Sequence, residues 1–96
     1  MMYTKLHKGS TIVLAVCDED LIGKKFEEGK LFLEVNEAFY KGEKKTKEEV
    51  LELLNEIKNV NLVGEESVSV GIEAGIISKD HVLNMGGVPH AQFFVL

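Results

Sequence analysis

The sequence has no arginine and no tryptophan, and it contains one proline and one cysteine. Without arginine, no side chain can hold a phosphate through the two-pronged guanidinium contact, so a phosphate-rich partner is disfavoured. The single Cys17 cannot build a disulfide framework within the chain, and we expect a reducing, cytoplasmic location. No apolar run reaches the roughly 20 residues of a membrane span, and the start lacks a signal peptide, so no membrane association is expected.

The charge of the chain is uneven along its length. All eleven basic residues are lysine, and sixteen acidic residues leave a net charge of −5 at pH 7. Residues 1–48 carry nine lysines and nine acidic residues, whereas residues 49–96 carry two lysines and seven acidic residues. Because an acidic half repels phosphate backbones, nonspecific nucleic-acid binding is disfavoured.

The length and the 45% hydrophobic content predict one domain, 1–96, of mixed α/β (α+β) class. β-Favouring runs at Tyr3–His7 and Thr11–Cys17, separated by a Lys-Gly-Ser turn, predict a hairpin. A second hairpin is predicted with Gly29 in its turn and Leu31–Val35 as its second strand. The N-terminal half should therefore consist of β-hairpins, with Asp18 capping a short helical turn after the first of them.

The clearest helix is predicted over Thr46–Asn59. Thr46 and Glu49 have the spacing of a capping box, and the apolar residues that follow recur at helical spacing. The lysine-rich residues 36–47, which overlap the start of this helix, predict an irregular connection with a short turn through Ala38–Tyr40 that stops at Gly42. A solvated loop and a docking patch for an acidic partner both explain those lysines.

The second half predicts a βαβ-like crossover unit. It has a strand at Val60–Val63, a helix from Glu65 to Ala74 with Gly75 at its C-cap, and a parallel strand at Val82–Met85. The apolar tail Phe93–Leu96 favours either an edge strand in its own sheet or pairing with a second copy in a homodimer.

The segment GGVPHAQ is the strongest candidate for a binding site. It follows a predicted strand, at the edge where open α/β sheets bind ligands. Gly86 and Gly87 allow a close backbone approach, and Pro89 stiffens the chain, so that His90 and Gln92 share one face. A tight turn into a last strand, with His90 hydrogen-bonded in the core, explains the same residues without a binding role.

The catalytic alternative uses His90 as a general base with Cys17 or Asp18 opposite it. The acidic residues after Cys17 would raise the pKa of its thiol, and most cysteines in such positions are small buried hydrophobic residues. No metal site or cofactor is expected, because the histidines and the cysteine do not have the spacing of metal ligands. We therefore favour a binding role over catalysis.

The segments AVCDEDLIGKKFEEGKLFLEV, NLVGEESV and GGVPHAQ resemble the small archaeal proteins of domain-of-unknown-function family 424. The resemblance runs from Tyr3 to Gln92, and the tail FFVL extends beyond it. It implies an archaeal cytoplasmic protein with a translation-linked accessory role, and it supplies no activity, cofactor or catalytic residue. The resulting hypothesis is an accessory or binding protein that acts through Gly86–Gln92 on a protein or RNA partner.

Overall fold

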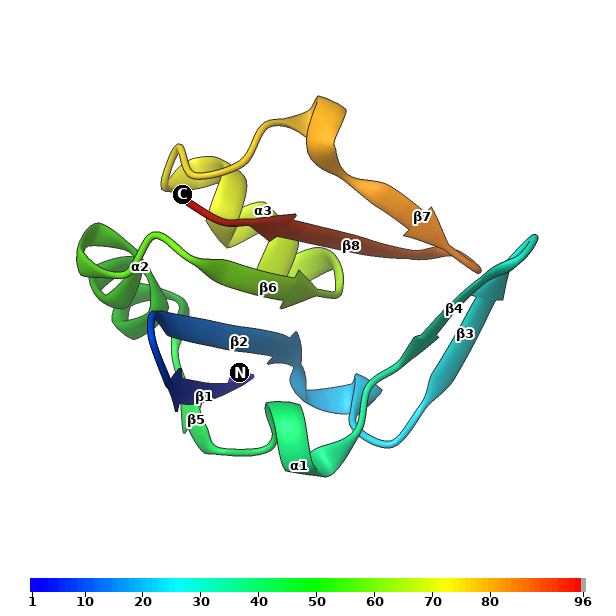
Figure 1. Cartoon of the computed structure of the whole chain (residues 1–96), viewed down its shortest axis with the longest axis horizontal. Helices are drawn as coiled ribbons and strands as arrows, with labels where there is room; N and C mark the ends of the chain where they lie inside the picture. The colour runs from blue at the N-terminus through cyan, green and yellow to red at the C-terminus, as the bar shows by residue number, and fades with distance from the viewer. Residues whose placement is uncertain (96) are drawn as a thin grey trace.

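The computed structural model describes residues 1–95, which form eight strands, three α-helices and two short 3-10 turns. These elements are β1 (Met2–Lys8), β2 (Ile12–Asp18), η1 (Glu19–Leu21), β3 (Lys25–Glu28), β4 (Leu31–Glu34), α1 (Glu37–Tyr40), β5 (Glu43–Lys45), α2 (Lys47–Glu56), β6 (Val60–Val63), α3 (Glu65–Glu73), η2 (Lys79–His81), β7 (Leu83–Met85) and β8 (Val88–Phe93). Six strands form one sheet in the order β5-β1-β2-β6-β8-β7, and β3 and β4 form a separate hairpin (Figure 1). The mixed α/β class is confirmed.

The crossover topology has one feature that the sequence pattern does not predict. β6 and β7 run in the same direction, as expected, because each pairs antiparallel with β8. β8 therefore lies between them, and the parallel neighbours that share hydrogen bonds are β2 and β6. The C-terminal strand is present, but the prediction that it lies at an edge is wrong, since β7 is the outer strand.

The C-terminal tail returns to its own sheet as far as Phe93, which pairs with Val60. The backbone N–H of Val95 then donates to Asn59 Oδ1 over 2.6 Å. Leu96, the last residue of the predicted tail strand, lies outside the described residues. The homodimer alternative stays a prediction.

The connection before α2 contains the helix α1 at the predicted short turn and a strand, β5, that was not expected. Asn36 caps α1, and its Oδ1 accepts from the backbone N–H of Phe39 over 2.8 Å. β5 then pairs antiparallel with β1 at the edge of the sheet. The capping box of α2 is confirmed between Thr46 and Glu49, although the helix ends at Glu56, earlier than predicted.

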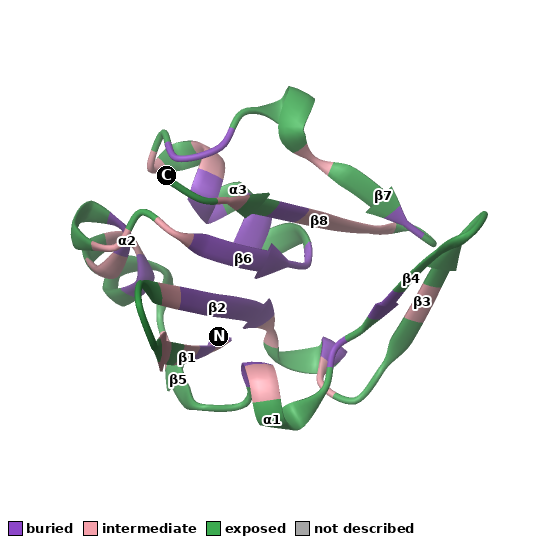
Figure 2. Ribbon diagram, viewed as in Figure 1, coloured by how far each residue is buried: buried purple, intermediate pink, exposed green. Residues whose placement is uncertain are grey.

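Two apolar clusters lie on opposite faces of the sheet, because their residues alternate along β2 and β6. Figure 2 shows that both strands are buried over most of their length. On one face, α2 and α3 cover β2, β6 and β8, with Leu14, Leu54 and Leu62 almost completely buried. On the other face, η1, α1 and the β3–β4 hairpin cover one end of the sheet around Cys17 and Val63. None of the helices within residues 1–95 is long and apolar enough to cross a membrane.

Candidate functional site

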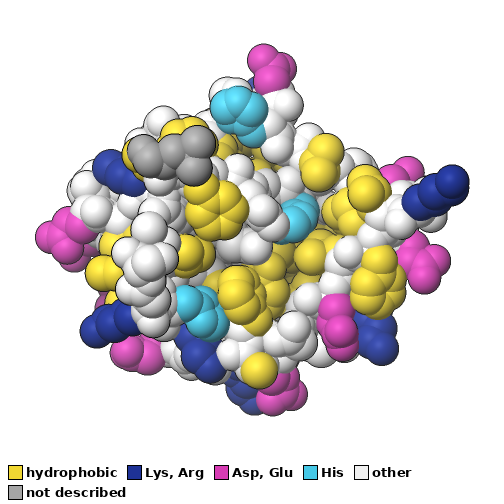
Figure 3. All heavy atoms as spheres, viewed as in Figure 1, with side chains coloured by type: hydrophobic (Ala, Val, Ile, Leu, Met, Phe, Trp, Pro, Cys, Tyr) yellow, Lys and Arg dark blue, Asp and Glu magenta, His cyan; other side chains and the backbone are white. Residues whose placement is uncertain are grey.

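The second face of the sheet is covered at one end only, and the rest forms a shallow hollow. Strand register places Asn61 beside Gln92, and His90 beside Leu83, with their side chains on this face. Tyr40 of α1 borders the same surface, because its hydroxyl reaches Asn61. Figure 3 shows hydrophobic side chains gathered around this part of the molecule, with a histidine among them. We call the surface formed by Tyr40, Asn61, Leu83, His90 and Gln92 the hollow.

A chain of three polar side chains lies within the hollow. Asn61 Oδ1 accepts from the hydroxyl of Tyr40 over 2.7 Å and lies 3.2 Å from His90 Nε2. Because the amide oxygen is an acceptor, this contact requires a hydrogen on Nε2 and leaves Nδ1 of a neutral ring as an acceptor. Burial lowers the pKa of His90 below its usual 6.5 and favours that neutral ring at pH 7.

Among residues 1–95, no carboxylate or ammonium group borders the cavity of the hollow, and its edge carries exposed apolar side chains. Leu83 is 55% exposed and Phe94, just after β8, is 48% exposed. A cavity of about 260 Å³ lies here, bordered by His81 and Leu83 together with His90 and Gln92. The surface is therefore apolar at its margin and offers uncharged hydrogen-bonding groups within.

The lysines of the connection before α2, and Lys47 at the start of α2, are paired with carboxylates of the same chain. The Nζ–carboxylate distances are 3.9 Å for Lys41–Glu37, 2.6 Å for Lys44–Glu19, 3.8 Å for Lys45–Glu43 and 2.9 Å for Lys47–Glu73. Each exposed pair contributes little to stability. Together, however, they neutralise the charge that a patch for an acidic partner would use, which favours the solvated-loop interpretation.

Gly86 and Gly87 form the two-residue turn between β7 and β8, with φ angles of 60° and 92°. Left-handed backbone at both positions is what a tight turn of this kind requires. A Cβ on Gly86 would lie 2.9 Å from the carbonyl oxygen of Glu27, and the backbone N–H of Gly86 donates to Glu28 Oε1 over 3.1 Å. The close approach at Gly86 is thus made by the β3–β4 hairpin of the same chain, whereas a Cβ on Gly87 would meet open space.

Pro89 occupies a position in β8 where its missing N–H is not needed. The carbonyl oxygen of Pro89 accepts from the backbone N–H of Gly64 over 2.9 Å. Because the carbonyl and the nitrogen of one strand residue point to the same side, the nitrogen of Pro89 also faces Gly64. β6 ends at Val63, and the gap in the hydrogen-bond ladder therefore falls beyond the last residue of that strand. From this point, the alternation of β8 sends His90 and Gln92 to the hollow, as their spacing predicts.

The two partners considered for catalysis do not join His90. Cys17 is fully buried, and burial, with smaller contributions from Asp18 and Asp20, raises the pKa of its thiol to about 12. Val63 lies between Cys17 and His90 across the sheet. Asp18 faces the opposite side, where its carboxylate accepts hydrogen bonds from the first turn of α3. The geometry brings together no acid–base pair from these three residues.

The role of Asp18 also differs from the prediction that it caps the short helical turn after β2. It precedes η1, but its side chain makes no capping hydrogen bond there. The carboxylate instead caps α3, accepting from the backbone N–H groups of Glu66 and Ser67 over 3.1 Å and 2.8 Å. Helix α3 starts after Gly64, which has no side chain to supply that cap, and this explains why a carboxylate from β2 is used.

Tyr40, Asn61 and Leu83 are members of the hollow that the sequence did not predict, and Asn61 is the one that joins two others. It is an amide within the four-residue strand β6, every residue of which is buried. A buried polar side chain in such a run requires hydrogen-bond partners, and this requirement is the signal that could have identified it. Its partners, Tyr40 and His90, lie 21 and 29 residues away along the chain, so the pairing depends on the fold.

The fold and the hollow define a small mixed α/β protein with an incompletely covered sheet face. Its residues 7–96 match a family described as "Protein of unknown function (DUF424)", and the chain belongs to that family. The match confirms the resemblance and includes the tail, which was expected to extend beyond it.

A solved structure supports the same assignment. The crystal structure of an uncharacterized conserved protein from Methanopyrus kandleri is similar to this chain, with 32% sequence identity and a TM-score of 0.81. The alignment covers 99% of this chain and 91% of that chain. No curated protein matches the sequence.

Proposed function

We propose that this protein is a binding module that docks a partner protein in the hollow, adjacent to the Gly86–Gln92 turn and strand. The observation that carries the proposal is the exposure of Leu83 and Phe94 beside a hollow whose five defining side chains carry no charged group at pH 7. Large apolar side chains grouped at a concave surface are typical of protein interaction sites. This makes an accessory role, without chemistry of its own, the function that the geometry supports best.

The polar groups of the hollow suit an uncharged segment of a partner protein. Neutral His90 offers Nδ1 as an acceptor, and the exposed amide of Gln92 offers both donors and an acceptor. A peptide backbone supplies the complementary N–H and C=O groups, and an apolar side chain of the same segment would contact Leu83. The partner is therefore an extended, uncharged stretch of polypeptide with at least one apolar side chain.

RNA is a less suitable partner for this surface. The chain has no arginine and a net charge of −5. The lysine-rich connection already pairs its ammonium groups with carboxylates of the same chain. Phosphate contacts supply most of the affinity in nucleic-acid binding, and this surface offers few free cations for them. The translation-linked role implied by the family resemblance stays a prediction, which a protein partner would also satisfy.

Site-directed photo-crosslinking tests the proposal. A photoreactive benzoyl-phenylalanine replaces Gln92 in the hollow or, as a matched control, Asn55 on the exposed side of α2. After irradiation in an extract of the source cells, we expect a discrete protein adduct from position 92 and none of the same mass from position 55. Adding Leu83→Asp to the position-92 protein should abolish the adduct, because it places a charge at the margin of the hollow.

Three outcomes would contradict the proposal. An adduct that ribonuclease destroys would identify RNA as the partner. The same adduct from both positions would show that the partner has no preference for the hollow. An adduct that persists with Leu83→Asp would show that binding does not depend on this surface. Circular dichroism of the Leu83→Asp protein checks that the fold is retained, as expected for a side chain that is 55% exposed.

A further inference from the structure

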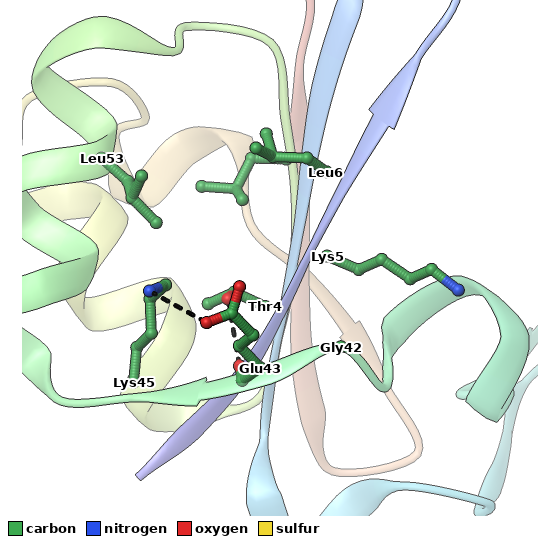
Figure 4. Close-up of a pocket in the computed structure, with 8 residues that line it drawn as sticks. Thr4, Lys5, Leu6, Gly42, Glu43, Lys45 and Leu53 are labelled. Atoms are coloured by element: carbon green, nitrogen blue, oxygen red, sulfur yellow. Dashed lines mark hydrogen bonds and ion pairs between the residues drawn. The ribbon is translucent and has the colours of Figure 1, made fainter.

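A second concave surface lies on the opposite, helix-covered face of the sheet. It is a cavity of about 270 Å³ between α2 and the β1–β5 edge (Figure 4). Thr4 and Leu14, both almost fully buried, lie at its base. Leu6, 43% exposed, and the partly buried Leu53 also line it. Helix α2 therefore does not cover this corner of the sheet completely.

Aliphatic side chains form two walls of this cavity, and the ion pair of Glu43 and Lys45 also lines it. Figure 4 shows the side chains of Leu6 and Leu53 on its two sides, from β1 and α2 respectively. Lys5 points away toward α1, where its Nζ donates to the carbonyl of Ala38 over 2.6 Å. The hydroxyl of Thr4 donates to the carbonyl of Glu43 over 3.0 Å. Leu6, Leu14 and Leu53 thus supply the aliphatic contacts within the cavity, beside the ion pair of Glu43 and Lys45.

The size of the cavity limits what it can hold. Small-molecule sites usually enclose roughly 300–1,000 Å³, and the volume of about 270 Å³ is below that range. It suffices for one aliphatic side chain with part of its backbone. A side chain presented by another protein is therefore a better occupant than a cofactor or a metabolite.

The charges beside the cavity select among protein partners. The adjoining surface of α2 carries Glu49, Glu52 and Glu56, with Lys45 as its one cation. Lys45 lies 3.8 Å from Glu43, with which it forms an ion pair. Within residues 1–95, Glu52 and Glu56 form no ion pair by the same distance measure. A cavity with aliphatic walls and unpaired carboxylates at its border is complementary to an aliphatic side chain flanked by lysine or arginine.

We propose that the groove between α2 and β1 docks one aliphatic side chain of a basic segment from a partner protein. The aliphatic side chain enters between Leu6 and Leu53, and the flanking cations face Glu52 and Glu56. This site is distinct from the hollow, because the two lie on opposite faces of the sheet. With both sites, the protein would join two partners of different chemistry.

A peptide titration followed by NMR tests the groove directly. The probe is the synthetic peptide acetyl-Lys-Lys-Leu-Lys-Lys-amide, added to the isotope-labelled full chain up to millimolar concentration. Two control peptides replace the leucine by serine or all four lysines by glutamate. We expect the probe to shift the amide signals of Leu6, Leu14 and Leu53 and to leave those of His90 and Gln92 unchanged. Neither control peptide should produce these shifts.

Charge-reversed variants separate a specific groove from general attraction. Glu52→Lys with Glu56→Lys should weaken probe binding about threefold to tenfold, the range expected for the loss of two exposed ion pairs. Glu27→Lys with Glu34→Lys changes the net charge equally on the distant β3–β4 hairpin, and it should leave the affinity unchanged. Leu6→Ser removes an exposed wall of the groove without emptying the core, and it should abolish the shifts.

Several results would overturn the proposal. The absence of any shift at millimolar probe would exclude a basic segment as the occupant. If the serine peptide bound as well as the probe, the aliphatic side chain would have no role. If both charge-reversed pairs weakened binding equally, the attraction would be nonspecific electrostatics. Shifts centred on His90 would assign the peptide to the hollow. The last result would leave the hollow as a binding site, so the two proposals fail separately.

Discussion

Asp18 and Ser67, 49 residues apart in the sequence, are joined by two hydrogen bonds. Asp18 Oδ1 accepts from the backbone N–H and from the hydroxyl of Ser67, each over 2.8 Å. Ser67 is fully buried, and the second carboxylate oxygen accepts from the N–H of Glu66. A carboxylate at the end of β2 thus satisfies the first turn of α3 and fixes this helix against the sheet.

Asp18→Ala should lower the free energy of unfolding by about 1–2 kcal/mol, as the loss of a helix cap does. The substitution leaves the N–H groups of Glu66 and Ser67 without their acceptor. Asp18→Asn should cost less, because an amide oxygen can still accept one of these hydrogen bonds. Urea unfolding measures the difference, with the exposed Asp20→Ala as a control within about 0.5 kcal/mol of the wild type. A similar loss at both positions would show that the cap is unimportant.

Gly64→Ala should disturb the same junction through the backbone. Gly64 has a φ of 107°, and a Cβ at this position would overlap the carboxyl group of Asp18. Gly75 has a φ of 77° but open space around it, so Gly75→Ala isolates the backbone strain alone. Each should destabilise by more than about 1 kcal/mol, with the larger loss at Gly64. Thermal unfolding compares the two, and equal losses would mean that Asp18 moves aside freely.

Helix α2 provides a direct test of the packing on the helix-covered face. Leu54 is 1% exposed and belongs to the apolar cluster, whereas Glu52 on the same helix is exposed. Leu54→Ala should cost roughly 2–5 kcal/mol because it leaves a cavity. Glu52→Ala should change stability by no more than about 0.5 kcal/mol. Denaturant midpoints measure both, and comparable effects would show that the faces of the helix are assigned incorrectly.

The elements that were predicted correctly are those determined by neighbouring residues. The capping box of Thr46 and Glu49 lies within one helical turn, and the turn at Gly29 joins adjacent strands. Helix α1 has four residues, which is too short to show a helical period, and β5 has only three. The insertion of β8 between β6 and β7 depends on pairing across the whole sheet, which local patterns do not encode.

The candidate site was predictable to a similar extent. The alternation of an extended strand places His90 and Gln92 on one face, and the structure has them there. The hydrogen bonds of Asn61 to Tyr40 and His90 join three separate elements, and no spacing in the sequence indicates them. The position of Asp18 against α3 is nonlocal in the same way. Residues whose role depends on partners far away in the sequence could therefore be identified only from the structure.

Cys17 should not react with thiol reagents while the protein is folded. The side chain is completely buried, and a pKa of about 12 leaves almost no thiolate at about pH 8. Ellman's reagent should therefore modify Cys17 at the rate of unfolding, and denaturant should accelerate the reaction. A Cys17→Ser, Asn55→Cys protein, with its thiol exposed on α2, should react at once. Rapid modification of native Cys17 would show that the cover formed by η1 and α1 opens readily.

The stability of the protein should fall in mild acid through His90. Burial lowers the pKa of its imidazole below 6.5, so the unfolded chain takes up the proton first as the pH decreases. The stabilisation is therefore present above pH 6.5 and is lost as the pH falls through the lower folded pKa. Urea unfolding at about pH 7.5 and about pH 5.5 should show a smaller loss in His90→Gln than in the wild type. His81→Gln, at an exposed position in η2, should retain the wild-type loss. If His90→Gln also retains it, the protonation of His90 is not coupled to unfolding, and the carboxylates of the chain account for the acid sensitivity.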